Sequence, residues 1–100
     1  MVQERRLRAL AGKVATKEIL DVIVEAGKAQ YKDFTKFASV SSINQRLREL
    51  ENYGLIQHHM AREEKREEWY TPTEPGKKFR RQLHDMDELE QHLDMREEKG

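Results

Sequence analysis

The chain has 100 residues, no cysteine, 38% charged side chains and a mean hydropathy of −1.01. This length indicates one domain with a small core, for which self-association is a common source of extra stability. The absence of cysteine excludes thiol redox sensing, zinc–thiolate sites and cysteine nucleophiles. No apolar run approaches the ~18 residues of a membrane span, and no signal-peptide region is recognisable, so we expect a soluble, cytoplasmic protein.

The charges are distributed unevenly, although they sum to zero. Residues 1–81 carry 17 basic and 12 acidic side chains, whereas residues 82–98 carry seven acidic side chains and one basic side chain. A moderately basic body with an acidic appendage is typical of a nucleic-acid binder that keeps one element away from its ligand.

The first third of the chain predicts a short N-terminal segment and two helices. Residues 1–12 are basic, and three interpretations of them stay open. The segment is a short helix, an arm that contacts DNA phosphates, or a frayed terminus. Apolar residues recur at helical spacing over residues 14–26, and Gly27 is a stop signal. Residues 29–31 fit a very short strand, and residues 32–38 predict a second, short helix.

Residues 41–56 contain the helix with the most informative surface. Ser41 or Ser42 can cap its start, Ile43, Leu47 and Leu50 form one apolar stripe, and glycine at position 54 ends it. The opposite face carries Ser, Asn, Gln and Arg side chains, which supply the donors and acceptors that DNA base edges and phosphates require. The alternative is an ordinary amphipathic helix with a solvated face. A short helix, a tight connection and this helix together match a helix-turn-helix.

The last 46 residues predict a β-hairpin and a long helix. Residues 55–60 and 67–71 read as two strands around a charged turn, and Pro72 ends their pairing. Thr73 can cap a helix over residues 74–96, whose apolar residues follow a heptad-like spacing beyond the needs of a small core. This spacing predicts pairing between two copies of the helix. The expected seam residues are Phe79, Leu83, Met86, Leu89 and Leu93.

Two strings then identify a family resemblance. LRELENYGLI, followed by a hairpin and WYTPTEPGKKF, resembles the corresponding segments of small winged-helix regulators of the PadR, HxlR and MarR kind. Those families carry an L-x-x-L-x-x-x-G-L-I string after the recognition helix and a Y-x-L-T-x-x-G string that closes the wing. Here Pro72 stands where leucine is usual, and the N-terminal cysteine that is common in the HxlR type is absent.

The resemblance implies an α+β, mostly α fold: a winged helix-turn-helix with a three-helix core, a β-hairpin wing and a long C-terminal helix. It implies a DNA-binding domain over residues 1–75, with 1–12 as its basic N-terminal segment, and a dimerisation helix over residues 76–100, as in many small archaeal proteins of this type. Residues 42–52 become the recognition helix, and residues 60–68 become the wing.

We therefore expect a homodimeric, sequence-specific double-stranded DNA-binding transcriptional regulator, associated with the nucleoid. The residues expected to contact DNA are Ser41, Ser42, Asn44, Gln45, Arg46, Arg48, Lys32, Lys36, Arg62, Lys65 and Arg66. The wing is less basic than usual, because residues 62–68 hold three bases and four acids. Two alternatives stay open: a winged helix that only binds proteins, and a non-specific chromatin-type protein.

The sequence contains no pattern that predicts catalysis, a metal site or a cofactor. There is no glycine-rich phosphate loop, and the carboxylates lie in solvated runs rather than as an isolated pair. His58 and His59 are adjacent on a strand and point to opposite faces, while His84 and His92 lack a ligand cluster. We expect a non-enzyme with no membrane partner, and no residue specifies a small-molecule effector.

Overall fold

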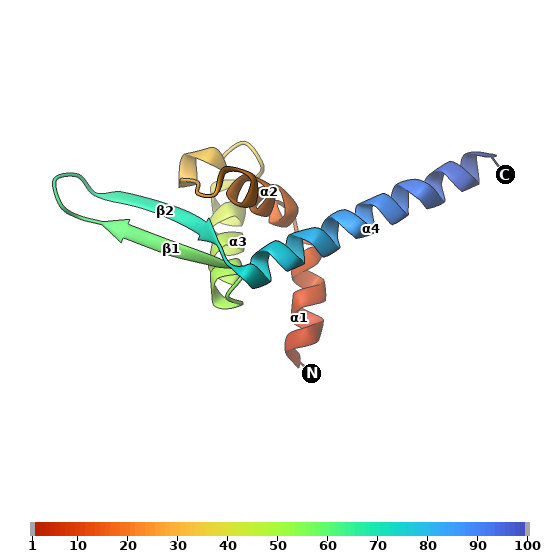
Figure 1. The fold of residues 1–100 in the computed structure, drawn as a ribbon, viewed down its shortest axis with the longest axis horizontal. Coiled ribbons are helices and arrows are strands. Elements are labelled where there is room, and N and C mark those ends of the chain that lie inside the picture. Colours follow the sequence, from red (N-terminus) through yellow and green to blue (C-terminus); the bar gives the residue numbers. More distant parts are fainter. Residues whose placement is uncertain (1, 100) are drawn as a thin grey trace.

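A computed structural model describes the backbone of residues 2–99 and the side chains of residues 6–95. Its helices are α1 (Val2–Ala11), α2 (Thr16–Ala26), a 3-10 turn η1 (Tyr31–Asp33), α3 (Val40–Asn52) and α4 (Glu74–Lys99). The antiparallel strands β1 (Ile56–Ala61) and β2 (Glu67–Pro72) lie between α3 and α4. This element order confirms the predicted winged helix-turn-helix. The hairpin and α4 project from the body in opposite directions, and α1 leaves it in a third direction (Figure 1).

The core lies where the four helices and the base of the hairpin meet. Its members are Leu10, Ala15, Ile19, Leu20, Ile23, Ala29, Phe34, Ile43, Leu47, Leu50, Leu55, Ile56, Phe79 and Leu83. The helix predicted over residues 14–26 begins two residues later, because Ala15 adopts a left-handed conformation with φ of 72°. Buried Thr16 then donates a 2.7 Å hydrogen bond to the carbonyl of Leu10, which ties α2 to the end of α1.

The prediction of a helix over residues 32–38 is wrong. Only the three residues of η1 are helical in this part of the chain, and turns follow them. Both ends of this segment are held in other conformations. Ala29 exchanges two backbone hydrogen bonds with Tyr70, of 3.0 and 2.8 Å, and Ser39 is extended as the cap of α3. Phe34, fully buried between these anchors, fixes the middle of the segment. Too few residues remain for a cooperative helix.

The start of α3 is capped by Ser39 rather than by Ser41 or Ser42. The Ser39 side chain accepts a 3.2 Å hydrogen bond from the backbone N–H of Ser42, and its hydroxyl lies 3.0 Å from the Ser42 hydroxyl. Glycine 54, with φ of 73°, follows the helix and turns the chain into β1, as the sequence indicates.

The hairpin register runs from Ile56 opposite Pro72 to Ala61 opposite Glu67. His58 stacks on Tyr70, with ring centroids 4.8 Å apart, and His59 stacks on Trp69 at 5.3 Å. These cross-strand pairs lie on opposite faces of the ribbon and stiffen it.

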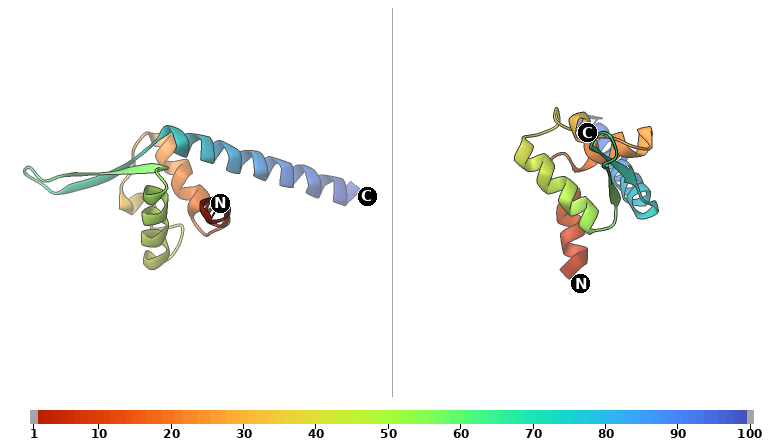
Figure 2. Two further views of the ribbon diagram at one scale, coloured as in Figure 1. Left: turned by 90° about the horizontal axis from the view of Figure 1, so that it is seen from below. Right: turned by 90° about the vertical axis from the view of Figure 1, so that its left-hand side faces the viewer.

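Helix α4 begins as the sequence predicts, because the Thr73 hydroxyl accepts a 3.1 Å hydrogen bond from the N–H of Gly76. The same hydroxyl donates to the carbonyl of Gly54 at 2.6 Å, which joins the start of α4 to the end of α3. The first turns of α4 pack on α2, whereas the later turns extend away from the body (Figure 2). Within the described residues, no helix is long and apolar enough to cross a membrane.

Candidate nucleic-acid interface

The outward face of α3 is exposed and polar over its whole length. The exposed side chains are Ser41, Asn44, Gln45, Arg48 and Asn52. None of the ion pairs formed among residues 6–95 involves Arg48, so its guanidinium is free to bind a ligand. Ser42 is only half-exposed, and its amide and hydroxyl bond to the Ser39 cap. Ser42 therefore shapes the start of the helix rather than its outer face.

Arg46 does not belong to this face, contrary to expectation. Its side chain is 6% exposed, and its Nη1 atom pairs with Glu49 one turn later. The other oxygen of Glu49 accepts a 2.8 Å hydrogen bond from the Nζ atom of Lys13. On the helix, Arg46 lies next to the apolar stripe of Ile43, Leu47 and Leu50, and it is buried together with them. A buried and paired guanidinium cannot reach a phosphate.

A groove of about 320 Å³ separates α3 from β2. Its lining residues are Asn44, Leu47, Arg48, Glu51 and Tyr70. Tyr70 packs edge-on against Phe34, and burial raises the pKa of its hydroxyl, with the carboxylates of Glu68 and Glu51 adding to the shift. The hydroxyl therefore stays protonated at neutral pH and can donate a hydrogen bond. Tyr70 lies beside α3 only because the hairpin brings β2 there, so no local pattern in the sequence marks it as a groove residue.

Exposed basic side chains lie on the segment before α3 and at the tip of the hairpin that follows it. Lys32 and Lys36 are exposed on the segment before α3, with the Lys36 ammonium 5.4 Å from the ring centroid of Phe37. At the hairpin tip Arg62, Lys65 and Arg66 are exposed. The guanidinium of Arg66 lies 3.7 Å from Glu68, so an acid partly neutralises it, as the mixed charge of the tip suggests.

The expected dimer seam divides into two parts. Phe79 and Leu83 are 7% and 5% exposed and belong to the core of their own chain, so their assignment to the seam is wrong. They share a helical face with the later apolar residues, and a heptad pattern alone does not say where the intramolecular core stops. Met86, Leu89 and Leu93 are 61%, 59% and 49% exposed, beyond the reach of the body.

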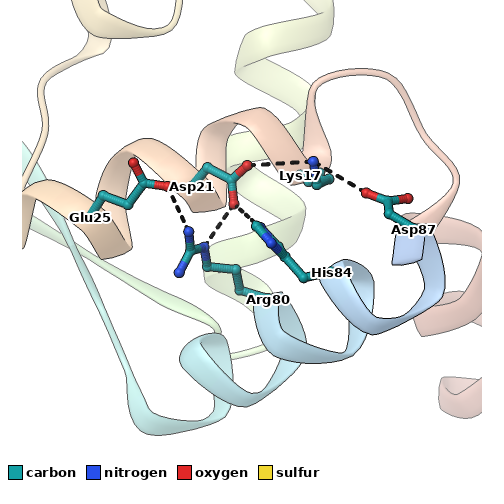
Figure 3. A network of polar contacts seen from close by, with 6 residues as sticks. All are labelled: Lys17, Asp21, Glu25, Arg80, His84 and Asp87. Carbon is teal, nitrogen blue, oxygen red and sulfur yellow. Dashed lines mark hydrogen bonds and ion pairs between the residues drawn. The ribbon is translucent and has the colours of Figure 1, made fainter. Parts of the chain in front are cut away.

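A network of six charged or polar residues fastens α4 to α2 (Figure 3). It joins Lys17, Asp21 and Glu25 of α2 to Arg80, His84 and Asp87 of α4. Asp21 is its centre: Oδ1 accepts from Arg80 Nε at 2.7 Å and lies 2.7 Å from His84 Nε2. Only the Lys17–Asp21 pair, at 3.7 Å, was visible in the sequence as an i,i+4 spacing. The network sets the direction in which α4 leaves the body.

Asp21→Asn should destabilise the fold in a pH-dependent way. Burial raises the pKa of Asp21, but hydrogen bonds from His84 and Arg80 outweigh burial and leave the pKa below its ordinary value. A lowered carboxyl pKa contributes stability that is present above the unfolded pKa of about 3.9 and is lost as the pH falls through the lower folded value. We expect Asp21→Asn to reduce the free energy of unfolding at pH 7 by about 1–2 kcal/mol.

Urea unfolding followed by circular dichroism from neutral to strongly acidic pH measures this difference. The deficit of Asp21→Asn relative to the wild type should shrink as the pH falls below about 4, because protons then bind Asp21 in the unfolded wild-type chain and, at still lower pH, in the folded chain. Asp85→Asn, an exposed position on α4, is the matched control and should change stability by less than about 0.5 kcal/mol. A deficit that stays constant down to the lowest pH would show that the charge of Asp21 is not responsible.

The described part of the chain contains no group of three or more His, Cys, Asp or Glu side chains arranged to hold a metal ion. A family model described as HxlR-like helix-turn-helix matches residues 7–98. The match covers the helices of the core, the hairpin and the extended part of α4. No curated protein matches the chain.

Proposed function

Because the chain belongs to the HxlR-like helix-turn-helix family of DNA-binding regulators, we propose that it is a homodimeric transcriptional regulator of a specific double-stranded DNA sequence. The observation that carries this proposal is the outward face of α3. It is polar, exposed and free of salt bridges at Arg48, while the opposite face is buried in the core. An exposed helix of this kind fits the major groove.

In this proposal α3 reads base edges and its neighbours contact the backbone. Ser41, Asn44, Gln45 and Arg48 enter the major groove, with Arg48 suited to a bidentate contact with guanine and Gln45 to one with adenine. Phosphates are contacted by exposed bases on either side of α3: Lys32, Lys36, Arg62, Lys65 and Arg66. Arg46, which is buried, and Ser42, which bonds to the Ser39 cap, support α3 and are not among the proposed DNA contacts.

Residues 1–75 then form the DNA-binding lobe, and residues 76–100 carry the dimer contact. Met86, Leu89 and Leu93 support this division, because these large apolar side chains, like that of Met95, are exposed on the outer part of α4, where most other side chains are polar or charged. A two-fold dimer presents two α3 helices to major grooves about one helical turn apart. We place the protein in the cytoplasm with the chromosome, where its target lies.

Selection of bound duplexes from a random pool by the full chain tests this function. We expect enrichment of one motif with inverted-repeat symmetry and half-site centres about 10 base pairs apart. Binding without a preferred sequence, but with a steep salt dependence, would instead identify a non-specific chromatin-type protein. If the chain retains no DNA from the pool even at low salt, the remaining interpretation is a winged helix that binds only proteins, and the proposal is overturned.

A further inference from the structure

Glu51, in the last turn of α3, carries a carboxylate that the fold leaves without a partner. The residue is exposed, and among residues 6–95 no ion pair or side-chain hydrogen bond includes its side chain. Glu49, two residues earlier, differs in this respect, because Arg46 and Lys13 both pair with it. The fold therefore uses one acid of this turn and leaves the other free.

A free carboxylate is unfavourable at this place in the fold. The last turn of α3 contains no basic residue, and the carbonyl groups at the C-terminal end of a helix carry a partial negative charge. An acid at this end destabilises the helix, whereas a neutral side chain of the same size does not. A residue that opposes the local preference without forming a contact in return indicates a functional role.

Glu51 lies on the flank of α3 that faces the hairpin. It lines the groove of about 320 Å³ between α3 and β2, whose other lining residues are Asn44, Leu47, Arg48 and Tyr70. Burial raises the pKa of the Tyr70 hydroxyl, and the carboxylates of Glu68 and Glu51 raise it further, so Glu51 is close enough for its charge to act there. The free acid is therefore part of the same surface as Arg48.

Helical geometry places Arg48 and Glu51 so that they reach neighbouring base pairs. Three residues of an α-helix separate them by about 60° around the axis and by about 4.5 Å along it. Base pairs are stacked about 3.4 Å apart. If α3 enters a major groove, the guanidinium and the carboxylate therefore meet base pairs one or two steps apart.

A carboxylate on a DNA-facing helix discriminates among the four bases. It only accepts hydrogen bonds, and it repels phosphates, so it weakens binding wherever no donor meets it. In the major groove guanine presents two acceptors, thymine presents an acceptor and a methyl group, and adenine presents an amino group beside the N7 acceptor. Cytosine presents only an amino donor. A carboxylate in the groove therefore favours cytosine.

We propose that Glu51 selects a cytosine, by accepting a hydrogen bond from its N4 amino group, within two base pairs of the guanine that Arg48 binds. This inference rests on the DNA-binding function proposed above and assigns a specificity-determining residue to it. Arg48 supplies attraction to DNA, and Glu51 supplies rejection of the other bases at its position. The unfavourable place of the carboxylate in the helix is then a consequence of selectivity.

Selection of duplexes from a random pool by the full-length wild type, Glu51→Gln and Arg48→Ala tests the proposal. Glutamine keeps the size and shape of glutamate but removes its charge. We expect the wild-type motif to contain a cytosine that Glu51→Gln no longer selects, within two base pairs of the position that Arg48→Ala no longer selects. The other positions of the motif should stay the same in Glu51→Gln.

Fluorescence anisotropy then measures the discrimination at that cytosine. With the selected duplex and a duplex that has a T·A pair in place of this C·G pair, the wild type should prefer cytosine by about tenfold or more, and Glu51→Gln should lose most of this preference. The affinity of Glu51→Gln for random duplex should rise about two- to tenfold, because a charge that repels phosphates is removed. Glu88→Gln, the same change at an exposed position on α4, is the matched control and should select the wild-type motif.

The melting midpoint distinguishes base recognition from a structural role. Glu51→Gln removes a carboxylate from the C-terminal end of a helix, so its midpoint should equal or exceed that of the wild type. If the loss of preference is accompanied by a lower midpoint, Glu51 supports the fold of α3, and the inference fails.

The other outcomes separate this inference from the proposed function. If the wild type selects a motif and Glu51→Gln selects it with the same preferences, Glu51 does not contact a base, and the inference fails although the regulator function stands. If Glu51→Gln binds every duplex more tightly by one common factor, Glu51 acts only through its charge, and the inference fails as well. If the wild type selects no motif, the proposed function fails, and this inference fails with it.

Discussion

Replacing Gly76 by alanine is expected to lower the free energy of unfolding by about 3 kcal/mol or more, a large part of the stability of a small domain. A Cβ atom at this buried position would lie 1.9 Å from the carbonyl oxygen of Leu55 and 2.9 Å from its carbonyl carbon. Both are backbone atoms of the turn between α3 and β1, so no side chain can rotate to make room. The first turn of α4 would have to move away from the core.

Thermal unfolding followed by circular dichroism measures this effect, and the midpoint should fall by about 15 °C or more. Gly12→Ala is the matched control, because its new Cβ would meet nothing closer than 3.8 Å and its φ lies outside the left-handed region. Equal midpoints for Gly76→Ala and the wild type would show that α4 does not approach Leu55 this closely. Thr73, three residues earlier, caps the helix, so both the threonine and the glycine of the wing-closing string have physical roles here.

The double variant Gln45→Ala/Arg48→Ala should bind its selected duplex at least about 100-fold more weakly than the wild type. Each side chain is exposed on the outward face of α3, and a bidentate contact to the correct base is worth about 1–3 kcal/mol. Affinity for random duplex should fall much less, because phosphate contacts from the flanking lysines and arginines remain. The variant therefore loses selectivity more than it loses binding.

Fluorescence anisotropy with the selected duplex and a scrambled duplex of the same composition gives both affinities. Arg81→Ala/Gln91→Ala removes the same two residue types from exposed positions on α4 and should keep the preference for the selected duplex. Because neither Gln45 nor Arg48 contributes to the core, the melting midpoint of the double variant should match that of the wild type. If the double variant has the same ratio of the two affinities as the wild type, α3 does not recognise the DNA sequence.

Local signals predicted much of the fold. The hairpin, the stop at residue 54, the Thr73 cap and the long helix after it depend on short-range patterns and are confirmed. The polar outer face of α3 also followed from helical spacing, since Ile43, Leu47 and Leu50 fix which side is buried. The combination of these elements in one order was enough to indicate the winged helix, and the family match agrees with it.

Errors arose where a residue lies at the border of a pattern. Arg46 is at the edge of the apolar stripe, and its burial depends on Glu49 and on Lys13, which is distant in sequence. Phe79 and Leu83 fit the same heptad pattern as Met86, yet only the position of α2 decides that they are covered. The segment over residues 32–38 has helical character, but its two ends are held by Tyr70 and by the Ser39 cap.

By itself, the sequence determined which elements form and which face of α3 is polar, because periodicity and capping act over a few residues. Only the tertiary structure decided where α4 leaves the core and which charged side chains are free. The exposure of Met86, Leu89 and Leu93 and the pairing of Asp21 with Arg80 and His84 depend on how α2 and α4 pack. Burial and ion pairing between distant segments leave no local signal, since they arise from the sum of all contacts in the fold.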